Sequence, residues 1–96
     1  MAKIWELLDR VQQLIGASQY SEAQTILDEI LRMDPQNMDA WDAYMRMCNT
    51  PGEYESLKTY IRKIWATRVH DDDYLFAMQR FLLQRVDERI EGIKAA

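Results

Sequence analysis

The sequence contains few of the residues from which cross-linked folds and most active sites are built. Its 96 residues include one cysteine and one histidine, so no internal disulfide can form, and a single cysteine suits a reducing compartment. Three glycines and two prolines are too few for the many turns of a β-sandwich or a β-barrel. No apolar run approaches the roughly 20 residues of a membrane span.

What the chain does contain is the composition of a folded, soluble protein. Apolar residues make up 48% and charged residues 29%, and the length corresponds to one domain. The net charge of −4 arises in residues 1–50, which hold eight acidic and four basic residues, whereas residues 51–96 hold eight of each. No signal-peptide core follows Met1, so we expect a cytoplasmic protein.

Basic residues are too dispersed to indicate binding to nucleic acid. The one cluster comprises Lys58, Arg62, Lys63 and Arg68. On a helix Lys58 and Arg62 share a face while Lys63 points elsewhere, and phosphate binding needs clustered cations. We therefore expect neither nucleic acid nor membrane as a partner.

Signals for helix ends divide the first part of the chain. A helix over about residues 3–15 is expected to end at Gly16, because glycine adopts the left-handed conformation at little steric cost. Ser21 and Gln24 have the spacing of a capping box and predict the start of a second helix. Pro35 predicts its end, since the residue before proline is disfavoured in the helical region.

Similar signals predict three more helices. Asn37 is a candidate N-cap for the third, and Thr50, Pro51 and Glu53 together predict the start of the fourth. Asp71–Asp73 place negative charge where a fifth helix would begin, which favours its dipole.

Apolar residues recur at helical spacing along each expected helix, and we expect them to form the core. In the first two helices they are Ile4, Leu7, Leu8, Val11, Leu14, Ile15, Ala23, Ile26, Leu27, Ile30 and Leu31. In the last three they are Ala40, Trp41, Tyr44, Met45, Cys48, Tyr54, Leu57, Ile61, Ile64, Trp65, Leu75, Met78, Leu82, Val86 and Ile93. No strand pattern is present, so the expected fold class is all-α.

The apolar pattern repeats with a period of 34 residues. Leu7, Trp41 and Leu75 coincide when the sequence is shifted by 34, as do Tyr20 with Tyr54 and Leu27 with Ile61. A repeated helix pair buries one face against its partner and leaves another for the next pair to cover.

The segments Gln19–Ala23, Met33–Asn37 and Ala40–Trp41 resemble the tetratricopeptide repeat (TPR) family. This resemblance implies one TPR-like domain over residues 1–96, a right-handed α-α superhelix. Its parts would be a repeat at about 4–37, a second at about 38–71 and a capping helix at about 72–95.

In that family the first helices of successive repeats line a concave groove that binds a partner. The resemblance maps the groove onto Trp5, Leu8, Asp9, Gln12, Ile15, Asp39, Asp42, Ala43, Arg46, Asn49, Asp73, Phe76, Ala77, Arg80 and Leu83. We assign partner binding to Trp5, Leu8, Gln12, Asp42, Arg46, Phe76, Arg80 and Leu83. Trp5, Phe76 and Leu83 lie off the core stripes and are candidate anchors, and Arg46 and Arg80 could hold carboxylates.

Two other interpretations of these residues remain open. They could be core residues, with the fifth helix filling the groove, or they could form a homodimer interface. The lysine and asparagine pattern with which some family members bind a C-terminal carboxylate is absent, so we do not expect a receptor for heat-shock chaperone tails.

No group of residues predicts catalysis, a cofactor or a metal. His70 and Asp71–Asp73 lack the spacing and the glycine of a cation-binding loop. Cys48 falls on a buried repeat position, and Asp39 with Asp42 is expected to be solvated surface. We therefore do not expect an enzyme.

The sequence favours a protein-interaction adaptor or scaffold that holds a peptide or helix of a partner protein. One alternative is a secretion-type chaperone that covers an aggregation-prone subunit. Another is a self-associating structural subunit. A fourth possibility, a designed or fragmentary repeat, would have no native partner.

Overall fold

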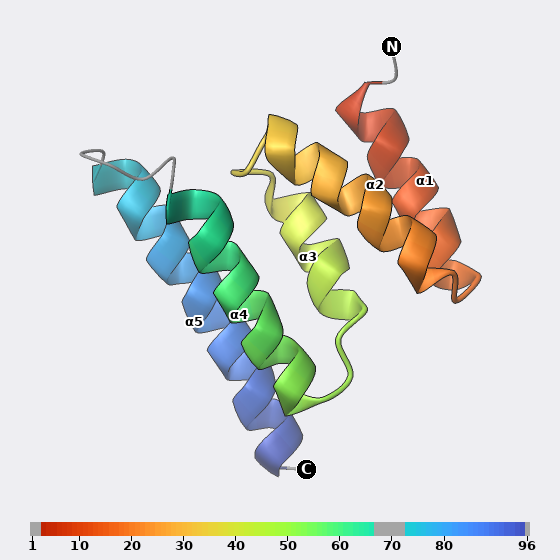
Figure 1. The fold of residues 1–96 in the computed structure, drawn as a ribbon. Helices are drawn as coiled ribbons and strands as arrows, with labels where there is room; N and C mark the ends of the chain where they lie inside the picture. The colour runs from red at the N-terminus through yellow and green to blue at the C-terminus, as the bar shows by residue number, and fades with distance from the viewer. Residues whose placement is uncertain (1–2, 67–72, 96) are drawn as a thin grey trace. The chain divides into compact units, whose positions relative to one another are not determined.

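The computed structural model describes residues 3–66 and 73–95, and within these ranges the chain is all-α. The helices are α1 (Ile4–Gly16), α2 (Tyr20–Met33), α3 (Met38–Arg46), α4 (Pro51–Ala66) and α5 (Asp73–Ala95), shown in Figure 1. The predicted fold class is confirmed. The chain divides into two compact units, residues 1–47 with α1 to α3 and residues 48–96 with α4 and α5. This division falls inside 38–71, the range expected for the second repeat.

The first unit is built around α2. Helix α1 packs against α2, and α3 packs against both of them. Helices α1 and α3 run in the same direction and α2 runs in the opposite one (Figure 1). The fully buried side chains include those of Val11, Leu27, Ile30, Leu31 and Trp41, all predicted as core.

The turn between α1 and α2 differs from the prediction. Gly16 is the last residue of α1, and the residue with a left-handed backbone is Ser18, at φ 60°. The Ser18 amide donates to the Ile15 carbonyl and the Gln19 amide to the Leu14 carbonyl, at 3.0 and 2.8 Å, which is the Schellman pattern.

The predicted capping box at the start of α2 is wrong. The helix begins at Tyr20, its N-cap is Gln19, and no side chain caps it. Because the chain leaves the left-handed residue directly into the helix, Ser21 already lies in the first turn, where its hydroxyl cannot act as the N-cap.

The turn between α2 and α3 confirms both of its signals. Asp34, before Pro35, has a non-helical backbone at φ −143° and ψ 81°, and it is the C-cap of α2. The Asn37 side chain accepts a hydrogen bond from the Ala40 amide at 3.0 Å and caps α3. The buried indole Nε1 of Trp41 donates to the Pro35 carbonyl at 2.8 Å, which fixes α3 to the preceding turn.

Cys48 was expected on the third helix, and this is wrong. Helix α3 ends at Arg46, and Cys48 lies beyond its C-cap, Met47. Helix α4 begins at Pro51 with Thr50 as its cap, so Cys48 lies in the connection between α3 and α4.

The second unit is an antiparallel pair of helices (Figure 1). At the start of α4 the Thr50 hydroxyl accepts from the Glu53 amide at 3.2 Å, which confirms the predicted cap. The Glu53 carboxylate accepts in return from the Thr50 hydroxyl and from the Asn49 amide, at 3.2 and 3.4 Å.

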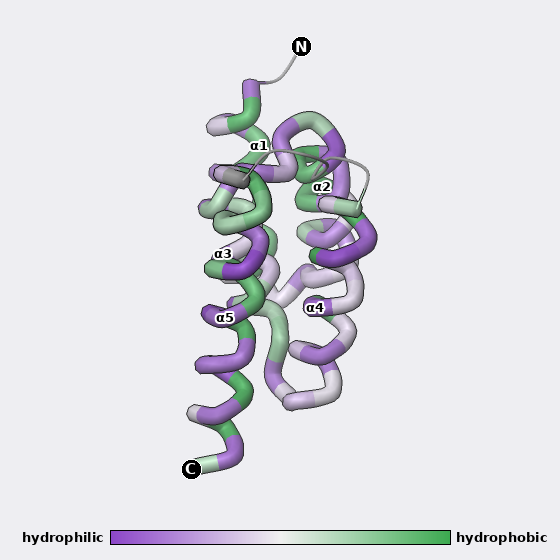
Figure 2. Tube along the Cα trace, turned by 90° about the vertical axis from the view of Figure 1, so that its left-hand side faces the viewer, coloured by the Kyte–Doolittle hydropathy of each residue, from purple (hydrophilic) through white to green (hydrophobic). Residues whose placement is uncertain are grey.

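Helix α5 is amphipathic and buries one stripe against α4. Leu82, Val86 and Ile90 are buried, and Figure 2 shows hydrophobic and hydrophilic stretches alternating along this helix. Ile90 was missed by the sequence analysis, and Ile93, which was assigned to the buried face, is 36% exposed. With 23 residues against the 16 of α4, α5 is the longer helix of the pair.

Candidate functional site

An open pocket of about 490 Å³ lies between α1 and α3. Its lining residues come from one face of each helix and are Trp5, Leu8, Asp9, Gln12, Asp39, Asp42, Ala43 and Arg46. We call this the α1–α3 pocket. Five of the lining residues are predicted partner-binding residues: Trp5, Leu8, Gln12, Asp42 and Arg46.

The parallel course of α1 and α3 places residues one period apart beside each other. The Arg46 guanidinium donates a hydrogen bond to the Gln12 side-chain oxygen, 34 residues away in sequence. This contact joins the C-terminal part of α3 to the third turn of α1. It therefore marks one end of the pocket, and Trp5, about 10 Å back along α1, marks the other.

The apolar part of the pocket has a buried floor and an exposed edge. Ala43 is 1% exposed and lies under the pocket, while Leu8 is half-buried. Trp5 is 65% exposed, so it is not a core residue of the single chain. Ile15, also mapped to the groove, is 8% exposed and is part of the core, because it lies four residues after the buried Val11 on the same face of α1.

Three carboxylates and one guanidinium give the α1–α3 pocket its charge. Asp9 and Asp39 are exposed, and Asp42 is half-buried. The Asp9 carboxylate accepts a long hydrogen bond of 3.4 Å from the Gln13 amide group, which carries no charge. The pocket is therefore acidic, with its one cation, Arg46, held by an uncharged side chain.

The remaining predicted site residues belong to α5. Arg80 and Leu83 line a second open pocket of about 510 Å³ together with Arg62, Ala77, Phe81, Gln84 and Asp87. Phe76 is 54% exposed and is not among the residues that line it. That the residues of α1, α3 and α5 form one groove stays a prediction.

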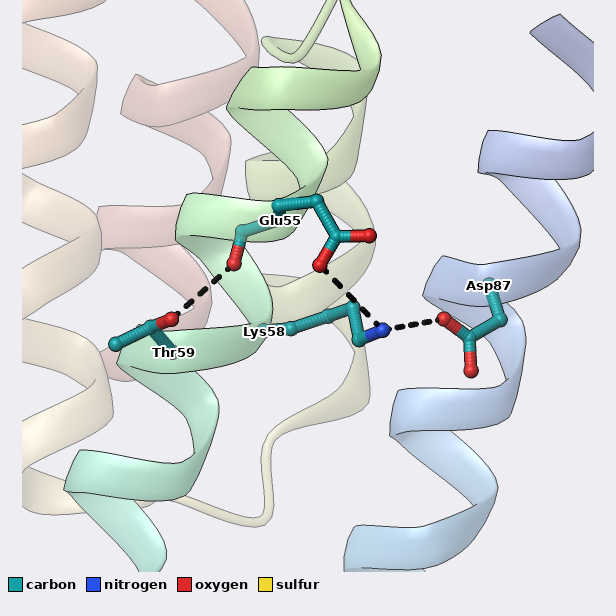
Figure 3. A network of polar contacts seen from close by, with 4 residues as sticks. All are labelled: Glu55, Lys58, Thr59 and Asp87. Carbon is teal, nitrogen blue, oxygen red and sulfur yellow. Dashed lines mark hydrogen bonds and ion pairs between the residues drawn. The ribbon is translucent and has the colours of Figure 1, made fainter. Parts of the chain in front are cut away.

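Lys58 joins the two helices of the second unit. Its Nζ lies 2.6 Å from an Asp87 carboxylate oxygen and 3.6 Å from a Glu55 oxygen (Figure 3). The hydrogen bond to Asp87 raises the pKa of Lys58 above its usual value. Because Asp87 is held by Lys58, the two arginines of the second pocket, Arg62 and Arg80, face a carboxylate that is already paired.

Two exposed aromatic side chains of α5 were not among the predicted site residues. Tyr74 is 67% exposed and Phe81 is 55% exposed, with the Arg85 guanidinium 6.0 Å from the Phe81 ring centre. The exposure of Phe81 could have been predicted from its position, because at helical spacing it lies beside the apolar stripe of Leu82, Val86 and Ile90 and not on it.

Cys48 is a poor nucleophile where the structure places it. Burial, and secondarily the negative charge of Glu53, raise the pKa of this half-buried thiol to about 11. The thiol is protonated at neutral pH, and the thiolate is the reactive form.

Most of the acidic run predicted to precede the fifth helix lies outside the described residues, and Asp73 is the first residue of α5. His70, Asp71 and Asp72 lie outside the described residues. Within residues 3–66 and 73–95, no three histidine, cysteine or acidic side chains gather to hold a metal ion. In the same ranges no helix combines the length and apolar character of a membrane crossing.

Comparisons of the chain with protein-family models, with curated proteins and with solved structures found no match. The candidate functional surfaces are therefore the α1–α3 pocket and the exposed side chains of α5.

Proposed function

We propose that the protein is a non-enzymatic interaction module that holds a peptide or helix of a partner protein in the α1–α3 pocket. The observation that carries this proposal is the exposed Trp5 at the edge of that pocket. Large exposed aromatic side chains beside a concave surface are the usual anchors of protein interfaces.

The chemistry of the pocket supports binding rather than catalysis. None of its described lining residues is a histidine, cysteine or serine, and the one thiol of the chain, Cys48, lies elsewhere. Trp5, Leu8 and Ala43 supply apolar contact, and Gln12 supplies hydrogen bonding. We place this module in the cytoplasm, because a single cysteine suits a reducing compartment.

We also infer a TPR-like arrangement of the repeats. The parallel course of α1 and α3, with α2 returning between them, supports this inference. So does the contact of Gln12 with Arg46, because their separation of 34 residues equals the period of the apolar pattern.

Self-association is the alternative that a specific observation favours. Tyr74, Phe76 and Phe81 are each more than half exposed on α5, and a second copy of the chain could cover them. A chaperone that covers an aggregation-prone subunit would use the same surfaces toward a different protein.

The proposal is tested by affinity capture from the native host with three baits. These are the wild type, Trp5→Glu in the pocket, and Tyr20→Glu as a matched control. Tyr20 is also an exposed aromatic of the first unit, it lies outside the pocket, and an acidic residue at the start of α2 suits the helix dipole.

A partner retained by the wild type and by Tyr20→Glu but lost by Trp5→Glu supports the proposal. Identical capture by all three baits contradicts it. Recovery of nothing but copies of the chain favours the self-associating subunit.

A further inference from the structure

Two of the three carboxylates that line the α1–α3 pocket, those of Asp9 and Asp39, are exposed. Neither Asp9 nor Asp39 forms an ion pair with any described residue. The guanidinium of Arg46 is bound to the Gln12 oxygen at the far end from Trp5. The two exposed carboxylates therefore dominate the Trp5 half of the pocket.

The rest of the first unit reinforces this field. Residues 1–47 hold eight acidic and four basic residues, whereas residues 48–96 hold eight of each. The whole net charge of −4 thus belongs to the unit that contains the pocket. A concave surface within a field of one sign attracts ions of the opposite sign and raises their association rate.

The aromatic and apolar members of the pocket suit a long cationic side chain. An indole face attracts an ammonium or guanidinium group, and Trp5 is 65% exposed for that contact. Leu8 and Ala43 can cover the methylene stem, because lysine and arginine bury their stems and keep their charge near water.

We infer that the occupant of the α1–α3 pocket is a basic amphipathic segment that places a lysine or arginine between Trp5, Asp9 and Asp39. This inference rests on the proposed function and names the chemistry of its partner. It differs from the expectation that Arg46 binds a carboxylate, because an acidic segment would meet Asp9 and Asp39.

The test measures binding of three fluorescein-labelled helical peptides to the full chain by fluorescence anisotropy. All three carry leucines on one face, and the other face carries lysine, glutamine or glutamate at the same positions. We expect the lysine peptide to bind about tenfold more tightly than the glutamine peptide at ~50 mM salt, and the difference to shrink at ~500 mM.

Two double variants separate the pocket from the general charge of the protein. Asp9→Asn with Asp39→Asn changes the pocket, and Glu22→Gln with Glu29→Gln makes the same charge change on exposed positions of α2. Circular dichroism verifies that each variant is folded. We expect about a tenfold loss of lysine-peptide affinity in the first pair and less than about twofold in the second.

The inference is overturned if the lysine peptide binds no more tightly than the glutamine peptide, or if both pairs of substitutions weaken it equally. A different result would contradict the proposed function, namely that Trp5→Leu leaves the affinity for all three peptides unchanged. Tighter binding of the glutamate peptide, with loss in Trp5→Leu, would keep the proposed function and reject the basic partner.

Discussion

Two buried tryptophans differ in whether their indole N–H group is hydrogen-bonded. Trp41 is 0% exposed and donates to the Pro35 carbonyl, whereas Trp65 is 1% exposed and its Nε1 has no hydrogen-bond partner in the described residues. A buried donor without an acceptor keeps the full cost of its desolvation, about 1–3 kcal/mol. Trp65 is therefore the less favourable of two similar core residues.

Replacement of each tryptophan by phenylalanine separates these cases. Both changes remove the same atoms, but Trp41→Phe also leaves the buried Pro35 carbonyl unpaired, whereas Trp65→Phe removes an unpaired donor. We expect the free energy of unfolding to fall by about 1–3 kcal/mol more for Trp41→Phe than for Trp65→Phe. Urea unfolding followed by circular dichroism measures both, and equal losses would contradict the account.

Cys48 permits a test by pH. Its folded pKa is about 11 against an ordinary value of 9.0, so at pH 8 we expect alkylation by iodoacetamide about a hundredfold slower than for the urea-unfolded chain. Folding favours the protonated thiol, so its contribution to stability is present below pH 9.0 and is lost as pH rises toward 11. An alkylation rate equal to that of the unfolded chain would show that the thiol is solvated.

At the scale of elements, the turn between α1 and α2 holds the one non-glycine residue with positive φ among those described, Ser18. A left-handed backbone costs a residue with a Cβ about 1–2 kcal/mol, and glycine avoids that cost. Gly16, two residues earlier, is helical, and a Cβ built there meets nothing within 4 Å.

We therefore expect Ser18→Gly and Gly16→Ala each to raise the free energy of unfolding, by about 0.5–1 kcal/mol. Thermal unfolding of both single variants and of the double variant measures this. The opposite substitution provides the control, since Ser18→Val places a β-branched residue at positive φ and should destabilise the chain. Loss of stability in Gly16→Ala would indicate that Gly16, as first expected from the sequence, is the left-handed residue.

The success of the sequence prediction differed between elements for physical reasons. The starts of α3 and α4 were predictable because Asn37 and Thr50 act on amides within their own helices. The α1–α2 turn was not, because a Schellman turn is fixed by backbone bonds that serine can also form. Ile93 was predicted as a buried residue, and Ile90, which is buried, was not. Which turns of α5 are buried depends on packing against α4, and the periodicity of α5 alone does not show this.

At the scale of the whole molecule, the sequence predicted part of the candidate site. The period placed Trp5, Leu8 and Gln12 opposite Asp42 and Arg46, and these residues line one pocket. The division after Met47 was not predicted, because apolar stripes show which residues leave solvent but not which helices they pack against.

Substitution of Phe76 tests whether its side chain belongs to the surface or to the core of the second unit. We expect Phe76→Glu to change the free energy of unfolding by less than about 0.5 kcal/mol, because this side chain is 54% exposed. Leu82→Glu, at a fully buried position on the same helix, should unfold the unit. Thermal unfolding and sedimentation measure both, and unfolding of Phe76→Glu would show that Phe76 is a core residue.

The short length of α3 limits the contact that the proposed partner could make along this helix. Its nine residues extend about 14 Å, which matches two and a half turns of a docked helix or about four residues of an extended strand. Contacts of this size belong to transient encounters, in which dissociation is fast. We therefore expect a partner that docks as proposed to be released and recaptured many times, so that the fraction of time that the pocket is filled follows the local concentration of that partner.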